Sequence, residues 1–169
     1  LDFTFHIIGD GEEKNNLCQL ATKLDLLNKI FFEGQKSHPY ENMHDADLFL
    51  IGSRYEGFPN VLLEAGVLGI PVVGFNSPGG ISEIIEEGVN GFLAENNNTR
   101  SFSDIINVVF LRTAWRIPNS ESTLGFSVYK SAMTKSDFKI FSYIGISITP
   151  ECLISLALKQ IKPSSSNTF

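Results

Sequence analysis

The stretch Ser53-Arg-Tyr-Glu-Gly-Phe-Pro-Asn-Val-Leu-Leu-Glu-Ala-Gly66 places two glutamates, Glu56 and Glu64, on either side of a predicted helix start. Pro59 suits the first helical position, and Gly57 permits a close approach of the backbone. The first amides of a helix have no partner within it, and together with the helix dipole they favour a phosphate group. The stretch therefore predicts a loop and a helix N-terminus suited to an anionic ligand.

Glu64 is the only charged residue in the segment 61–70, where the predicted helix is apolar nearly all round. Such a helix is expected to be buried, and a lone buried carboxylate is costly unless something pairs with it. Spacing alone leaves two interpretations open. Glu64 has a structural partner, such as a nearby lysine or a backbone amide, or it accepts hydrogen bonds from ligand hydroxyls.

Apolar runs alternate with helical patterns on both sides of this stretch, up to about residue 95. This alternation predicts a Rossmann-like α/β fold, a parallel sheet with flanking helices. Ligands bind such sheets beyond the carboxyl ends of the strands, so the loops that follow the strands should share one edge. The expected strands are 3–8, 30–32, 47–51, 71–75 and 92–94; the expected helices are 12–27, one capped by Ser37, 59–68, 81–87 and 102–111.

The pattern changes after Ala94. Residues 113–148 show no sustained period, 152–161 suggest a short helix, and 162–169 form a polar run. We therefore expect two regions: a partial Rossmann-like lobe over residues 1–112 and an irregular tail of undetermined structure over residues 113–169.

Composition narrows the class of protein. The 169 residues carry a net charge of −6, which argues against the basic footprint of a nucleic-acid-binding protein. Cys18 and Cys152 lack metal-type or redox-type spacing, and the three histidines form no ligand cluster. Neither a basic leader nor an apolar run of about 20 residues is present. These features predict a cytoplasmic protein with reduced thiols and no metal site.

Glu56 and Glu64 enclose seven residues, and Glu-Gly-Phe-Pro-Asn-Val-Leu-Leu-Glu resembles the E-x7-E motif of retaining family-4 glycosyltransferases with the GT-B fold. Four further blocks resemble the surroundings of that motif, in the same order along the chain. The resemblance covers residues 3–95. The four blocks are Ile7-Ile-Gly-Asp-Gly-Glu-Glu13, His44-Asp-Ala-Asp-Leu-Phe-Leu50, Leu68-Gly-Ile-Pro-Val-Val73, and Pro78-Gly-Gly-Ile-Ser-Glu-Ile-Ile85 with Glu87-Gly-Val-Asn-Gly-Phe-Leu93.

The resemblance implies a role for each matching residue. Glu56 would be the catalytic residue that faces the hydroxyls of the donor sugar, and Glu64 would accept hydrogen bonds from the ribose. The amides that follow Glu56 would approach the sugar and the diphosphate, and two further loops would hold the base and line the same edge. The implied donor-binding residues are Glu56, Gly57, Phe58, Pro59, Asn60, Val61, Glu64, Gly34, Gln35, Gly9 and Gly11.

The implied reaction transfers a sugar from a nucleotide donor, by default a uridine diphosphate sugar, to an acceptor hydroxyl with retention of anomeric configuration. It would need no metal ion or cofactor, because basic side chains and a helix N-terminus stabilise the departing diphosphate. The implied setting is polysaccharide or glycolipid biosynthesis, with the full-length enzyme peripheral to the inner membrane face.

Two parts of the family's GT-B fold are not found in this sequence. One is the N-terminal lobe, which binds the glycan or glycolipid acceptor. The other is the opening of the C-terminal donor lobe, where the family carries an arginine and a lysine that grip the diphosphate. The chain thus resembles an incomplete C-terminal lobe. We do not expect this chain to catalyse the reaction on its own. The alternative is a non-catalytic nucleotide-sugar-binding module or an inactive truncated remnant.

Overall fold

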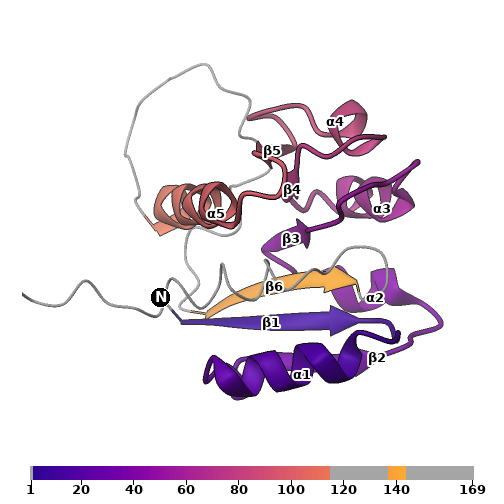
Figure 1. Ribbon diagram of the computed structural model, residues 1–169. Coiled ribbons are helices and arrows are strands. Elements are labelled where there is room, and N and C mark those ends of the chain that lie inside the picture. Colours follow the sequence, from indigo (N-terminus) through magenta and orange to yellow (C-terminus); the bar gives the residue numbers. More distant parts are fainter. Residues whose placement is uncertain (1, 115–136, 144–169) are drawn as a thin grey trace, which may run out of the picture.

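The computed structural model describes residues 2–114 and 137–143, which form a six-stranded parallel sheet with helices on both faces (Figure 1). The strand order is β2-β1-β6-β3-β4-β5. The strands are β1 (Asp2–Ile8), β2 (Ile30–Gly34), β3 (Leu48–Ile51), β4 (Val72–Phe75), β5 (Gly91–Ala94) and β6 (Asp137–Tyr143). The helices are α1 (Lys14–Lys23), α2 (Pro39–Met43), α3 (Asn60–Val67), α4 (Ile81–Ile84) and α5 (Thr99–Ala114).

The prediction of a Rossmann-like parallel sheet is confirmed. All five predicted strands form, and every recorded pairing between strands is parallel. Because all strands point the same way, the loops after β1, β2, β3 and β4 reach the same carboxyl edge of the sheet. This edge is where the candidate ligand-binding residues were expected.

The expectation that residues 113–148 hold no regular element is wrong for residues 137–143, which form β6. β6 lies in the middle of the sheet, between β1 and β3 (Figure 1). A short apolar run in an otherwise irregular region carries little periodicity, and what makes it a strand is pairing with a segment far away in the sequence. The predicted helix 152–161 and the polar run 162–169 lie outside the described residues.

Two hydrophobic cores hold the layers together, one on each face of the sheet. Alternate residues of each central strand point into opposite cores, as the pleat of a strand requires. The first core joins β1, β3 and β6 to α1 and α5 through Phe5, Leu50, Ile140, Leu17, Ala21, Phe102 and Ile106. The second joins β3 and β6 to α2, α3 and α4 through Phe49, Ile51, Phe141, Met43, Leu62, Ala65 and Ile81.

Several helix ends differ from the prediction. α1 ends at Lys23, because the backbone of Asp25 turns into the left-handed region with a φ of 56°. His38, and not Ser37, is the N-cap of α2, and Pro59 is the N-cap of α3 and not its first helical residue. α4 stops at Ile84, well before Glu87, whereas α5 extends beyond its predicted range at both ends.

The composition of α3 predicted a helix buried on all sides, and this prediction is wrong. Leu62 and Ala65 are buried against the sheet, whereas Leu63 is 44% exposed and Val67 is 89% exposed. The reason is geometric: a helix packed on one face of a sheet turns only one side toward the core. Glu64 lies between these two sides and is half-buried.

The exposed side of α3 also contains Gly66, for which we expect alanine to be stabilising. A Cβ atom added there meets no atom within 4 Å. Alanine loses less backbone entropy than glycine on entering a helix, so Gly66→Ala should raise the free energy of unfolding by about 0.5–1 kcal/mol. Urea denaturation followed by circular dichroism measures this change. A loss of stability would contradict the open surroundings of Gly66.

Candidate functional site

The loop that carries Glu56 is fastened to the loop that follows β4. Glu56 and Gly79 form an isolated parallel β-bridge. The amide of Gly80 donates a hydrogen bond to the carbonyl oxygen of Glu56 over 2.9 Å, and the amide of Glu56 lies 3.4 Å from the carbonyl oxygen of Pro78. The backbone of Glu56 is therefore fixed from both sides at the carboxyl edge of the sheet.

This contact requires glycine at two positions. Gly79 has a φ of 106°, and a Cβ atom there would lie 1.7 Å from the carbonyl oxygen of Glu56. A Cβ atom on Gly80 would lie 2.6 Å from the carbonyl oxygen of Gly57. The sequence predicts a turn at 78–80, but nothing in it shows that the turn packs against the Glu56 loop. We call this paired arrangement the Glu56–Gly79 clamp.

The Glu56 side chain is held by Ser53, a residue that the sequence reasoning did not assign to the site. The Ser53 hydroxyl donates a hydrogen bond to Oε1 of Glu56 over 2.6 Å, and Ser53 is only 4% exposed. A serine three residues before the glutamate, at the end of a buried strand, is the signal that could have identified it. The hydrogen bond orients the carboxylate while leaving it half-buried at the edge.

The residues between the two glutamates form the start of α3. Gly57, Phe58 and Asn60 are exposed, whereas Pro59 is buried close to Gly80. Val61 is half-buried one residue into the helix. The exposed residues at this helix start and the direction of the helix dipole favour an anionic group here.

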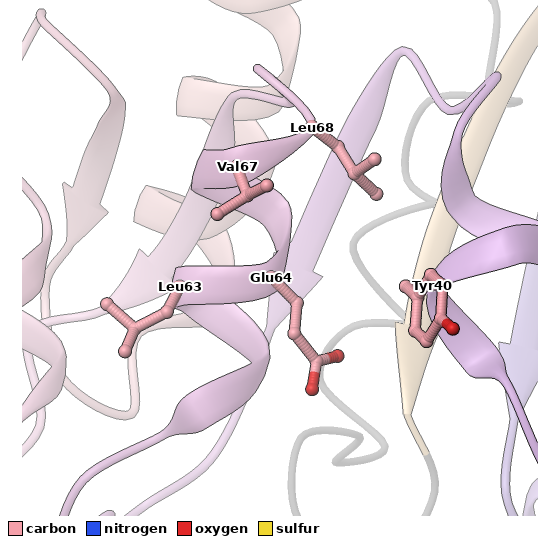
Figure 2. Close-up of a pocket in the computed structure, with 5 residues that line it drawn as sticks. All are labelled: Tyr40, Leu63, Glu64, Val67 and Leu68. Atoms are coloured by element: carbon pink, nitrogen blue, oxygen red, sulfur yellow. The ribbon is translucent and has the colours of Figure 1, made fainter.

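Glu64 borders a hollow of about 260 Å³ between α2 and α3, which Tyr40, Leu63, Val67 and Leu68 also line (Figure 2). The Oε2 atom of Glu64 is buried and has no hydrogen-bond partner in the described part of the chain. A lysine or backbone amide paired with this atom, the structural interpretation of Glu64, is therefore not observed there. A buried carboxylate oxygen without a partner suits a ligand that donates hydrogen bonds, and the hollow beside it is lined almost wholly by apolar surface.

The glycines of the first two loops also meet at the carboxyl edge. The amide of Gly9 donates a hydrogen bond to the carbonyl oxygen of Gly34 over 2.8 Å, and both residues have positive φ angles. Gly11 and Gln35 are exposed beside them. The structure thus brings Gly9 and Gly34 together in one group of loops, after β1 and β2. The residues from Glu56 to Glu64 form a second group, after β3. Within the described residues, no recorded hydrogen bond joins the Glu56 and Glu64 side chains.

A polar cluster lies on β1 and β2 and reaches Lys36 in the loop after β2. The His6 ring stacks between Phe31 and Phe141, with ring centroids 4.9 and 4.8 Å away. Its Nδ1 donates a hydrogen bond to Oε1 of Glu33 over 2.9 Å. This hydrogen bond is the main cause that holds the pKa of Glu33 below its usual value, with Lys36 as a further cause.

We expect Glu33→Gln to lower the free energy of unfolding at neutral pH, and to lower it less in acid. The loss at pH 7 should be about 0.5–1 kcal/mol, as for other partly exposed pairs. The folded state lowers the pKa of Glu33 below 4.5, so its stabilising effect is present above that value and disappears as the pH falls through the lowered pKa. Urea denaturation of both proteins at pH 7 and near pH 3.5 tests this. A difference that grows in acid would contradict it.

Over residues 2–114 and 137–143, no three histidine, cysteine, aspartate or glutamate side chains are grouped so that they could hold a metal ion. None of the helices in the same residues is long and apolar enough to cross a membrane.

The fold and the site define a Rossmann-like α/β lobe with a ligand-binding edge at the carboxyl ends of its strands. More narrowly, this chain belongs to the glycosyl transferases group 1 family, whose family model matches residues 1–113.

Curated relatives share this part of the chain. An uncharacterised glycosyltransferase of Haemophilus influenzae is 35% identical over 97 residues, which are 57% of this chain and 28% of that protein. The poly(ribitol-phosphate) α-N-acetylglucosaminyltransferase of Staphylococcus aureus is 33% identical over 102 residues, which are 60% of this chain and 21% of that enzyme. This chain therefore spans less than a third of the length of these two relatives.

Solved structures confirm the fold. HepE of Anabaena in complex with UDP superimposes with a TM-score of 0.61 and 28% identity, over 78% of this chain and 35% of HepE. The same protein in complex with UDP-glucose gives a TM-score of 0.60 at 29% identity, over 77% of this chain and 35% of HepE. The structural neighbours are GT-B glycosyltransferases.

Proposed function

We propose that this chain is the donor-binding part of a glycosyltransferase that moves a sugar from a nucleotide-sugar to an acceptor hydroxyl with retention of anomeric configuration. The observation that carries the proposal is the buried, unpartnered Oε2 of Glu64 beside the hollow between α2 and α3. Vicinal ribose hydroxyls would supply the hydrogen-bond donors that this oxygen lacks.

Glu56 has the position and the support that a sugar-binding carboxylate needs. Its backbone is fixed by the Glu56–Gly79 clamp, and its Oε1 is oriented by Ser53. A carboxylate held in this way loses little entropy when it accepts hydrogen bonds from the hydroxyls of the donor sugar. We assign Glu56 as the catalytic candidate, the carboxylate at the transferring sugar.

The start of α3 would stabilise the diphosphate of the donor. The exposed residues Gly57, Phe58 and Asn60 lie at the positive end of the α3 dipole, and charge builds up on the diphosphate as the sugar departs. The loops with Gly9, Gly11, Gly34 and Gln35 would hold the base. In this scheme the protein supplies the electrostatic stabilisation, and no metal ion or cofactor takes part.

Uridine diphosphate is the proposed nucleotide, supported by the complexes of HepE with UDP and with UDP-glucose. A glycan or glycolipid is the proposed acceptor. Similar proteins include a Vi polysaccharide biosynthesis protein of Salmonella typhi and a lipopolysaccharide 1,6-galactosyltransferase of Escherichia coli. A second lobe of the enzyme would bind the acceptor. The enzyme would act in the cytoplasm.

Calorimetric titration of the purified chain tests the donor half of this proposal. UDP and UDP-glucose are expected to bind saturably, and GDP at least tenfold more weakly. The same samples are unfolded thermally, to show that the protein is folded. A cooperatively unfolding protein that binds neither uridine nucleotide would refute the proposed donor site.

A further inference from the structure

β2 contains a β-bulge where it reaches the carboxyl edge of the sheet. The register with β1 passes from Phe32 directly to Gly34, which makes Glu33 an extra residue in β2. A bulge bends its strand and turns a side chain in a direction that regular pairing would not allow, and bulges are common beside functional sites. Here the bulge directly precedes the loop that is proposed to hold the base of the nucleotide.

The carboxylate of Glu33 is held by His6 of β1. The Nδ1 atom of His6 donates a hydrogen bond to Oε1 of Glu33 over 2.9 Å, and the two side chains are only 18% and 29% exposed. The ring is fixed on both faces, because it stacks between Phe31 and Phe141. The Thr4 hydroxyl lies 3.2 Å from Nε2 and can donate to it, so the neutral ring satisfies both of its nitrogens. Glu33 therefore has a rigid donor at a fixed position on the sheet.

The other oxygen of Glu33 reaches Lys36, on the far side of the loop. Oε2 of Glu33 lies 3.3 Å from Nζ of Lys36. Two residues, Gly34 and Gln35, separate Glu33 from Lys36 in the sequence. The carboxylate thus joins β1 to both ends of this short loop. We call the side chains of His6, Glu33 and Lys36 the loop clip.

The loop clip defines a conformation more than it adds stability. Ion pairs between partly exposed side chains contribute little to the free energy of unfolding. The loop itself is held in an unusual geometry: Gly34 has a positive φ of 70°, and its carbonyl oxygen accepts a hydrogen bond from the amide of Gly9. Side chains that hold a binding loop in one conformation reduce the entropy that is lost when the ligand binds.

We propose that His6, Glu33 and Lys36 are positioning residues for recognition of the base, and that they act by holding Gly34 and Gln35 in place. This inference rests on the proposed function, in which the loop holds uracil. Recognition of a base depends on directional hydrogen bonds, so a small displacement of the loop weakens it. The attraction between the diphosphate and the start of α3 is less directional and does not involve the loop. The loop clip therefore governs which nucleotide binds more than whether a diphosphate binds.

Amide hydrogen exchange of the intact chain tests the loop clip without any ligand. His6→Phe keeps the ring stack and removes the donor, and Glu33→Gln removes the charge. In both variants the Gly9 amide should exchange roughly tenfold faster than in the parent, because the carbonyl oxygen of Gly34 is no longer held in place. Lys23→Gln removes a charge from the exposed end of α1 and should leave this exchange unchanged. Unchanged exchange in the first two variants would overturn the inference.

Titration with UDP and with GDP tests the effect on base recognition. Glu33→Gln and Lys36→Gln should each weaken UDP binding about fivefold and leave GDP binding within about twofold of the parent, so that the preference for UDP falls. Lys36→Arg keeps the charge and should retain most of the preference. Residues with a merely structural role would instead reduce the number of binding sites, or weaken both nucleotides by the same factor. Either result would overturn the positioning role.

The loop clip and the proposed function fail in different ways. UDP binding with an unchanged preference in Glu33→Gln and Lys36→Gln would overturn the loop clip and leave the proposed donor site intact. A folded parent that binds no uridine nucleotide would refute the donor site, and the role of the loop clip in base recognition would fail with it. In that case the exchange of the Gly9 amide still decides whether the three side chains hold the loop.

Discussion

Glu64→Ala is expected to weaken UDP binding at least tenfold and to leave the protein as stable as the parent or more stable. Hydrogen bonds to a charged group contribute about 1.5–3 kcal/mol, and a tenfold loss of affinity corresponds to about 1.4 kcal/mol. The stability result has a separate cause. The substitution removes a buried carboxylate oxygen that has no partner in the described part of the chain, and such an atom costs free energy in the folded state. Calorimetry and thermal unfolding measure the two quantities.

Two variants make this result specific. Glu64→Gln keeps the size of the side chain and one acceptor oxygen, so its affinity should lie between those of the parent and of Glu64→Ala. Glu86→Ala removes an exposed carboxylate near the amino end of β5, on the opposite edge of the sheet, and should change neither quantity. A marked loss of stability in Glu64→Ala would show that the carboxylate has a structural partner, which is the other interpretation of Glu64.

Gly79→Ala is expected to have the largest effect on stability. The new Cβ atom would lie 1.7 Å from the carbonyl oxygen of Glu56, and the backbone φ of 106° is one that alanine rarely adopts. The chain must therefore move, breaking the Glu56–Gly79 clamp. We expect the free energy of unfolding to fall by about 2–4 kcal/mol, from backbone strain and lost hydrogen bonds together. UDP-glucose binding should fall with it, because Glu56 is no longer held in place.

Gly66→Ala is the matched control, since it adds the same methyl group where nothing lies within 4 Å. Urea denaturation of both variants separates the cost of the clamp from any general effect of replacing glycine. Equal stability of Gly79→Ala and the parent would show that the two loops are not in close contact.

The sequence was sufficient to predict the order and type of the strands and helices in residues 2–114. Buried parallel strands appear as short apolar runs, such as Leu48-Phe-Leu-Ile51, and glycine or proline separates them from helical patterns. Helix ends were less predictable. Pro59 is compatible with both the N-cap and the first helical position, and the stop of α1 depends on the left-handed backbone of Asp25.

Features that depend on distant contacts could not be predicted. Asp-Phe-Lys-Ile-Phe-Ser-Tyr shows no strong pattern, and it becomes β6 through its pairing with β1. The hydrogen bond from Ser53 to Glu56 and the contact of Gly79 with Glu56 depend on the geometry of loops. Likewise, Tyr40 borders the Glu64 hollow only because α2 packs beside α3. The motif identified the two carboxylates but not the residues that position them.

The late position of β6 in the chain affects how the protein can be synthesised. β1 and β3 leave the ribosome well before β6, the strand that lies between them, which ends at Tyr143. At about 5–20 residues per second, the inner edges of β1 and β3 wait roughly 5–20 s for their shared partner. Unpaired strand edges bind other strands readily. The nascent chain therefore exposes unpaired strand edges for longer than a chain in which the central strand comes first.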